Sequence, residues 1–207
     1  MTDSRLTVGI LGAGRVGKAI AALLRTAGYD VAMAGSLDDP GTVVSADVVV
    51  LAVPLHQYRN LPDLAGTLVI DAMNYWWELD GSRPEFEDAT TSSSEVVALH
   101  LPGARIVKTL NHLSGYALEE LARPRGSADR IAVAVAGDDS ADTEVVATLV
   151  DHMGFEPVRA GKLAYGVKFE PLTEAFGADA SAAELHDMLE RFWGSQRGRV
   201  VARARGL

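Results

Sequence analysis

The chain contains no cysteine among its 207 residues. Disulfide bonds, thiolate catalysis and cysteine-ligated metals are therefore excluded, and we predict no metal site. No apolar run reaches the length needed to cross a membrane, and the first five residues, Met-Thr-Asp-Ser-Arg, lack the hydrophobic region of a signal peptide. We therefore expect a soluble, cytoplasmic protein with no membrane partner.

Positive charge is also scarce relative to negative charge, and the formal net charge is −9. Non-specific nucleic-acid binding needs clusters of positive charge to displace counterions from phosphates, so we expect no nucleic-acid partner. The exception lies near the C-terminus, where a run of arginines is typical of a solvated or frayed end: Arg191, Arg197, Arg199, Arg203 and Arg205.

The strongest local pattern is a glycine-rich turn near the start of the chain. The segment Leu6–Leu11 is apolar or β-branched apart from one glycine, which indicates a buried strand. The spacing Gly12, Gly14, Gly17 follows at once. Apolar residues then recur at helical spacing until Gly28, which is predicted to cap the helix in a left-handed conformation.

Each glycine of this turn has a predicted role. Gly12 permits a tight bend, Gly14 removes the Cβ that would block a pyrophosphate, and Gly17 lets the helix pack close to the strand. Phosphates would lie on free N–H groups at the helix N-terminus. The pattern therefore predicts dinucleotide binding, and the alternative interpretation is a structural strand–helix turn with no ligand.

The tip of the predicted second strand, Tyr29–Ala34, should select between NAD and NADP. An acidic side chain there binds the ribose 2′-hydroxyl, whereas a basic or hydroxyl cluster accepts a 2′-phosphate. Ser36 suits a phosphate, but Leu37 follows it, and the aspartates at positions 38 and 39 disfavour one. We predict NADP on the strength of Ser36. The connection that follows is too short for the usual helix, so this side of the sheet should be trimmed.

Three further predicted strands end where ligands collect in open α/β sheets, beyond the carboxyl ends. Asp47–Val53 is a continuous apolar run that stops at a proline and leads into a short helix, as expected for a strand covered on both faces. Gly66–Ala72 leads to Asn74, a candidate for the reactive end of the cofactor. Ala104–Leu110 leads to two candidates for second-substrate contacts, Asn111 and His112.

Several of these side chains have two interpretations. His112 is either a general acid or base, with a pKa near the working pH, or a hydrogen-bonded structural residue. His56 is either ligand-facing or an exposed loop histidine, and the latter is the expectation. Trp76 and Trp77 either stack on a ring or cover the core edge or a subunit contact.

The rest of the chain completes a predicted α/β fold, a Rossmann-type doubly wound, mostly parallel sheet. Leu79–Thr91 is a polar loop, and Ser92 with Glu95 makes a capping box at the start of a short helix. A small-residue strand, a helix and a last strand follow between residues 131 and 159. We predict a dinucleotide-binding domain at residues 1–160 and a helical extension packed on it at residues 161–207.

These motifs occur in one order that resembles the NADPH-dependent coenzyme F420 reductases. The resemblance is carried by the glycine loop, the strand ending in Val53-Pro54, the Ser-Ser-Ser-Glu helix and the Pro-Gly-Ala-Arg-Ile-Val-Lys-Thr-Leu-Asn run. It spans nearly the whole chain. It implies hydride transfer between NADP(H) and the deazaflavin coenzyme F420 through apposed rings, so no catalytic acid or base is nominated.

The resemblance also implies which residues contact each substrate. For the dinucleotide these are Gly12, Ala13, Gly14, Arg15, Val16, Ser36, Val53 and Pro54, joined by Asn74 from the strand-end argument, and for the deazaflavin they are Asn111, His112 and Leu113. Leu37 departs from the family, which has an arginine there. Arg15 is the candidate to supply the missing charge.

Two alternatives stay open from the sequence. One is an NAD(P)-dependent reductase of a small carbonyl or imine, although the chain lacks the long helical second domain of many such enzymes. The other is a nucleotide-binding module without turnover. In each case we expect small-molecule ligands and a homodimer.

Overall fold

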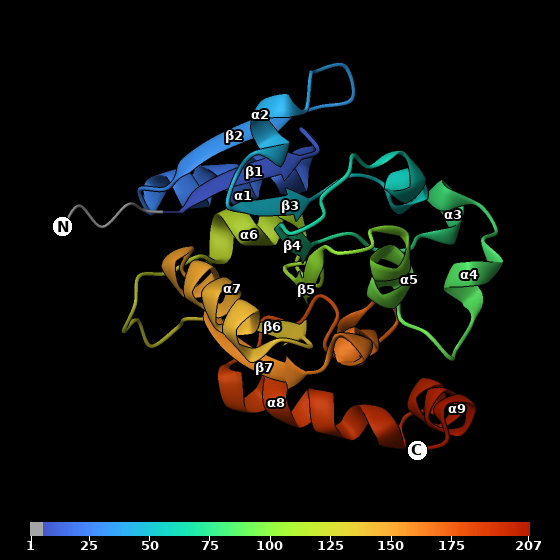
Figure 1. Ribbon diagram of the computed structural model, residues 1–207. Helices are drawn as coiled ribbons and strands as arrows, with labels where there is room; N and C mark the ends of the chain where they lie inside the picture. The colour runs from blue at the N-terminus through green and yellow to red at the C-terminus, as the bar shows by residue number, and fades with distance from the viewer. Residues whose placement is uncertain (1–5) are drawn as a thin grey trace.

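The computed structural model describes residues 6–207, and Met1–Arg5, where the prediction about a signal peptide falls, lie outside the described residues. The described chain forms one seven-stranded sheet flanked by helices (Figure 1). In order across the sheet, the strands are β2 (Asp30–Ala34), β1 (Thr7–Leu11), β3 (Val48–Leu51), β4 (Leu68–Asp71), β5 (Arg105–Thr109), β6 (Ala132–Gly137) and β7 (Glu156–Gly161). The predicted Rossmann-type α/β class is confirmed.

The sheet changes direction once. Strands β1 to β5 are parallel, whereas β6 runs antiparallel to β5, with Val107 opposite Gly137. Strand β7 is parallel to β6. The carboxyl ends of β1 to β5 therefore share one edge of the sheet, which we call the ligand edge, and β6 begins near it.

The helices are placed largely where the sequence predicts them. They are α1 (Arg15–Thr26), α2 (Gly41–Val44), α3 (Trp77–Asp80), α4 (Pro84–Glu87), α5 (Ser93–His100), α6 (Gly115–Leu121), α7 (Ser140–His152), α8 (Ala182–Arg191) and α9 (Gln196–Arg205), with 3₁₀ turns η1 (Leu55–Asn60), η2 (Leu163–Phe169) and η3 (Phe192–Gly194). The connection after β2 holds only the one-turn α2, which confirms the prediction that it is too short for the usual helix. The loop prediction at Leu79–Thr91 was incomplete, because α3 and α4 form there.

Alternation along the strands divides the core into two main apolar clusters. In β3, Val48 and Val50 belong to the cluster that includes residues of α1, α6 and α7, whereas Val49 and Leu51 belong to the cluster that includes residues of α2, η1 and α5. Successive side chains of a strand point to opposite faces, so a strand covered on both sides must be apolar throughout. The continuous apolar run of β3 thus follows from its central position.

Local capping fixes the ends of α1 and α5 as the sequence indicates. Gly28 follows the C-cap of α1 with φ of 85°, a left-handed conformation that glycine adopts without steric cost. At α5, the Ser92 hydroxyl accepts from the Glu95 N–H, and the Glu95 carboxylate accepts from the Ser92 N–H at 2.6 Å. This reciprocal pair is the predicted capping box.

The segment after β7 is helical and shares a core with the sheet. Leu185 and Leu189 of α8 pack against the alanines of β6, whose small side chains leave room for the helix. Before α8, at the end of η2, the chain passes the ligand edge, where the Phe169 carbonyl accepts a hydrogen bond from Asn111 at 3.1 Å. Strand β7 itself extends to Gly161, the first residue of the predicted extension.

The C-terminal arginines do not form a frayed end, but the prediction of a solvated one holds for Arg191, Arg199 and Arg203, which are exposed. Arg191 lies in α8 and the other four lie in α9, and two of the α9 arginines reach back into the protein. Arg197 pairs with Glu170 at 2.9 Å, and Arg205 pairs with Glu95 at 3.1 Å and donates to the Ala164 carbonyl at 3.0 Å. The arginines are anchors here, because buried or half-buried carboxylates elsewhere in the chain need their charge.

Candidate functional site

A cleft of about 810 Å³ opens at the ligand edge beside β1, β2 and β3. Its walls are Leu11–Gly14, Ala34–Asp38, Pro40, Ala52–Pro54, Gln57 and Asn60–Pro62. Ligands in open parallel sheets bind beyond the carboxyl ends of strands, near the point where strand order reverses. The order β2-β1-β3 places that reversal at β1, so the cleft lies where this fold binds ligands.

The three glycines of the turn serve different purposes. Gly12 has φ of 118°, and a Cβ there would lie 2.3 Å from the Ala52 carbonyl oxygen. A Cβ on Gly17 would lie 1.9 Å from the Gly12 carbonyl oxygen. A Cβ on Gly14 would meet nothing within 4 Å. Gly12 and Gly17 are thus required by close packing, whereas Gly14 faces open space in the cleft wall.

The N-terminus of α1 suits an anion. Gly14 is its N-cap, no side chain caps its first N–H groups, and its first turn carries no acidic residue. The unpaired N–H groups and the helix dipole together attract negative charge. The open position at Gly14 and the uncapped helix fit a dinucleotide pyrophosphate, and Gly12, Ala13 and Gly14 would hold it. Arg15 and Val16 begin the helix without lining the cleft.

The tip of β2 forms the opposite wall. Ser36, Leu37 and Asp38 all line the cleft, and Leu37 is 98% exposed. Arg15 does not reach this wall, because its side chain packs over the start of α6, where a Cβ on Gly115 would lie 2.6 Å from Arg15 Cγ. Arg15, the candidate to replace the arginine of the family, is therefore directed away from the tip of β2.

Val53 and Pro54 line the cleft after β3, and their contact with the nicotinamide, which the family resemblance implies, stays a prediction. Pro54 precedes η1, the predicted short helix. His56 lies in η1 and is partly exposed, with its Nδ1 2.9 Å from Oδ1 of buried Asp80. Asp80 also accepts from the His56 backbone N–H at 2.9 Å, so His56 anchors η1 to α3.

Asn74 and Asn111 lie together, as expected from their strand ends. Asn74 Nδ2 donates to the Asn111 carbonyl at 2.6 Å, and Asn111 Nδ2 donates to Asn74 Oδ1 at 3.0 Å. Asn111 is buried and Asn74 half-buried, and neither lines the described cleft. A contact of either residue with a ligand remains a prediction.

His112 and Leu113 face the core instead of a cleft. Leu113 packs in the main apolar cluster, and His112 is fully buried with its ring edge-on to Phe169. His112 Nε2 lies 3.0 Å from the backbone N–H of Ala134 and accepts from it, which assigns the ring proton to Nδ1. Burial lowers the pKa of His112 to about 4. The geometry fits the structural interpretation of this histidine, and a deazaflavin contact of His112 or Leu113 remains a prediction.

His112 should make stability depend on pH. The unfolded histidine titrates near 6.5, so between about pH 6.5 and 4 the unfolded chain binds the extra proton. The contribution of the neutral, buried His112 to the free energy of unfolding is fully present above that window. It should fall by about 3 kcal/mol as the pH drops through the window. His112→Gln, which retains an acceptor for Ala134, should flatten this part of the profile. Urea unfolding at several pH values measures it, with exposed His186→Gln as the control; an unchanged slope in His112→Gln would contradict the assignment.

Sequence reasoning missed a buried polar network beside the ligand edge. Lys108 is fully buried, and its Nζ donates to the Met73 carbonyl at 2.5 Å and to Asp71 Oδ2 at 3.2 Å. Asp71 also accepts from the Ser94 hydroxyl at 2.5 Å and from the Met73 N–H at 2.9 Å. These bonds fix the turn that carries Asn74. The available signal was a charged residue inside each of two apolar strands.

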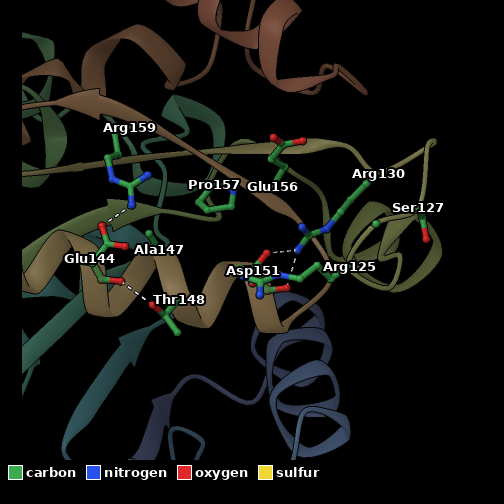
Figure 2. A pocket seen from close by; sticks show the side chains of 11 residues that line it. Arg125, Ser127, Arg130, Glu144, Ala147, Thr148, Asp151, Glu156, Pro157 and Arg159 are labelled. Atoms are coloured by element: carbon green, nitrogen blue, oxygen red, sulfur yellow. Dashed lines mark hydrogen bonds and ion pairs between the residues drawn. The ribbon is translucent and has the colours of Figure 1, made fainter.

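A second cavity, of about 520 Å³, lies around the C-terminal end of α7 and is lined with charged side chains (Figure 2). Arg130 donates to the carbonyls of Asp151 and Phe155 at 2.6 and 2.7 Å, and both Arg130 and Arg125 pair with the Asp151 carboxylate. Burial raises the pKa of Asp151, but the two guanidinium groups outweigh this, and the pKa lies below its usual value. The paired charges cap the helix, which is a structural role.

No family model matches the chain. The putative protein YjhV of Escherichia coli K12 is 41% identical over 80 residues, which are 39% of this chain and 56% of that protein. The chain thus matches about half the length of this curated relative.

Solved structures share the fold over most of the chain. A hypothetical protein, SMa0349 from Sinorhizobium meliloti, has a TM-score of 0.68 and 27% identity, covering 87% of this chain and 95% of that one. A putative F420-dependent NADP-reductase from Arthrobacter sp. FB24 has a TM-score of 0.60 and 23% identity, covering 92% and 94%. An imine reductase variant from Myxococcus stipitatus, in complex with NAD+, has a TM-score of 0.55 and 17% identity, and covers 98% of this chain and 66% of that one.

Among residues 6–207, no helix has both the length and the apolar character that crossing a membrane would require.

Proposed function

We propose that the protein is an oxidoreductase that transfers a hydride between a nicotinamide dinucleotide and coenzyme F420 or a related flavin-like acceptor. The observation that carries the proposal is the cleft at the ligand edge, where Gly14 leaves open space and α1 presents an uncapped N-terminus. A pyrophosphate is the anion that this geometry and this fold together favour. The likeness to the putative F420-dependent NADP-reductase supports the choice of acceptor.

The residues of the cleft would act by binding and orienting. The backbone of Gly12–Gly14 would hold the pyrophosphate, the tip of β2 the adenosine ribose, and Val53 with Pro54 the nicotinamide side. The bound nicotinamide supplies the hydride chemistry, so the protein has to set ring distance and exclude water. His112 is fully buried, so its ring is not exposed to a ligand as a general acid or base. This agrees with hydride transfer, which needs no proton-transfer residue.

The proposed hydride transfer holds with either dinucleotide. The family resemblance implies NADP(H), to whose 2′-phosphate Ser36 in the cleft would offer a hydroxyl. A cytoplasmic homodimer is also proposed. Trp76 and Trp77 are both exposed, so they are available either for ring stacking or for the contact between subunits.

Turnover with F420 tests the function directly. Purified protein is mixed with NADPH or NADH and oxidised F420, and the absorbance of both coenzymes is followed. We expect the two absorbances to fall together, because hydride transfer consumes them one for one. Turnover of a small cyclic imine or carbonyl in place of F420 would favour the alternative reductase, which shares its fold with the imine reductase. Dinucleotide binding with no turnover of any acceptor would instead indicate a binding module.

A further inference from the structure

The charge of the cleft is opposite to what a 2′-phosphate requires. Among the described residues that line it, Asp38 is the single ionisable side chain, and none is lysine or arginine. The neighbouring Leu37 is 98% exposed and has no polar atom in its side chain. Arg15 packs over Gly115 at the start of α6 and does not line the cleft. A phosphate at the tip of β2 would therefore meet a carboxylate with no cation beside it.

Asp38 is held in place at this tip. Its Oδ2 accepts a hydrogen bond from the Gly35 backbone N–H at 2.8 Å. A Cβ built on Gly35 would lie 3.3 Å from the same oxygen and 3.2 Å from the Ala13 Cβ, so the carboxylate sits beside the glycine turn. Within residues 6–207, Asp38 Oδ1 has no hydrogen-bond partner, which leaves it free to accept from a ligand hydroxyl.

We propose that Asp38 binds the adenosine ribose through its 2′-hydroxyl and makes the cleft prefer NAD(H) to NADP(H). This inference rests on the proposed function, because it requires a dinucleotide in this cleft. A carboxylate accepts strongly from a hydroxyl and repels a phosphate at the same position, so one side chain both favours NAD(H) and disfavours NADP(H). The inference departs from the NADP prediction, since Ser36 suited a phosphate in the sequence but the structure adds Asp38 to the same wall.

The neighbouring Asp39 provides a matched control. It carries the same charge, is one residue away, and uses its Oδ1 to accept from the Gly41 N–H at 3.0 Å without lining the cleft. Asp38→Asn and Asp39→Asn therefore remove the same formal charge from the same loop. Asparagine at position 38 keeps an acceptor for the Gly35 N–H, so the loop should retain its conformation.

The experiment is a titration of wild type and both variants with NADH and with NADPH by calorimetry, after circular dichroism has shown that each is folded. Wild type should bind NADH more tightly by on the order of tenfold, from one close like-charge contact. Asp38→Asn should remove most of this preference, by weakening NADH and strengthening NADPH. Asp39→Asn should keep it.

Tighter binding of NADPH by wild type would overturn the inference, as would an unchanged ratio of the two affinities in Asp38→Asn. Either result would leave the proposed function standing, because a dinucleotide would still bind. Absence of binding for both dinucleotides would instead overturn the proposed function, and the inference with it. Equal shifts in the two aspartate variants would assign the preference to overall charge and would also refute a specific role for Asp38.

Discussion

Gly14→Val should abolish dinucleotide binding in a protein that still folds. Gly14 has an extended backbone, with φ of −75° and ψ of −173°, which valine adopts readily. Its Cβ would meet no protein atom within 4 Å, so the branched side chain would project into the space proposed for the pyrophosphate. The loss should exceed a hundredfold, about 3 kcal/mol, because the phosphates could no longer reach the helix N-terminus.

Calorimetric titration with NADH and NADPH measures this effect, and urea unfolding checks the fold. Gly194→Val is the matched control, because a Cβ there also meets nothing within 4 Å and the residue does not line the cleft. It should bind as wild type does. Unchanged affinity in folded Gly14→Val would show that the phosphate site is assigned wrongly. Substitution of Gly12 or Gly17 is uninformative about binding, since both sites clash with backbone oxygens.

Lys108→Met should cost about 3 to 5 kcal/mol of unfolding free energy, which is a large part of the stability of a typical domain. Methionine has nearly the right length and keeps the apolar contacts of the lysine stem. It leaves the Asp71 carboxylate fully buried with its cation removed, and it leaves the Met73 carbonyl without its donor. Uncompensated charge in the interior is what makes the change severe.

Urea unfolding measures the loss, with exposed Lys162→Met as the control, which should stay within about 0.5 kcal/mol of wild type. The double variant Asp71→Asn, Lys108→Met should recover part of the loss, because the buried carboxylate is then gone. If Lys108→Met lowered the free energy of unfolding by less than about 1 kcal/mol, the fold would not depend on an ion pair between Asp71 and Lys108.

The parts of the fold that the sequence predicts well are those governed by short-range rules. The glycine turn, the cap at Gly28 and the capping box at Ser92 each involve residues within a few positions of one another. Alternation and apolar runs identify the strands because each strand's faces are covered by adjacent elements. The cleft itself follows from the same rules, since strand order in this fold places the glycine turn beside the tip of β2.

The parts that sequence reasoning missed depend on distant contacts. His112 looks like a strand-end ligand residue, but η2 and β6 cover it, and Phe169 packs on its ring. The reversal of β6 has no local signature, because a strand's sequence does not record its direction. Arg205 finds its carboxylate 110 positions away, so no window of sequence shows the pairing that orders its helix.

Helix α9 gives the protein a folding order that its sheet alone would not have. A contact across 110 positions closes a large loop, and the entropy of that closure is lost before the contact is made. During synthesis, Glu95 and Glu170 leave the ribosome before α9. Their carboxylates therefore have no arginine partner until α9 has been made and has docked. The strand ladder can therefore assemble first, and neutralisation of the carboxylates beside the ligand edge comes among the final events of folding.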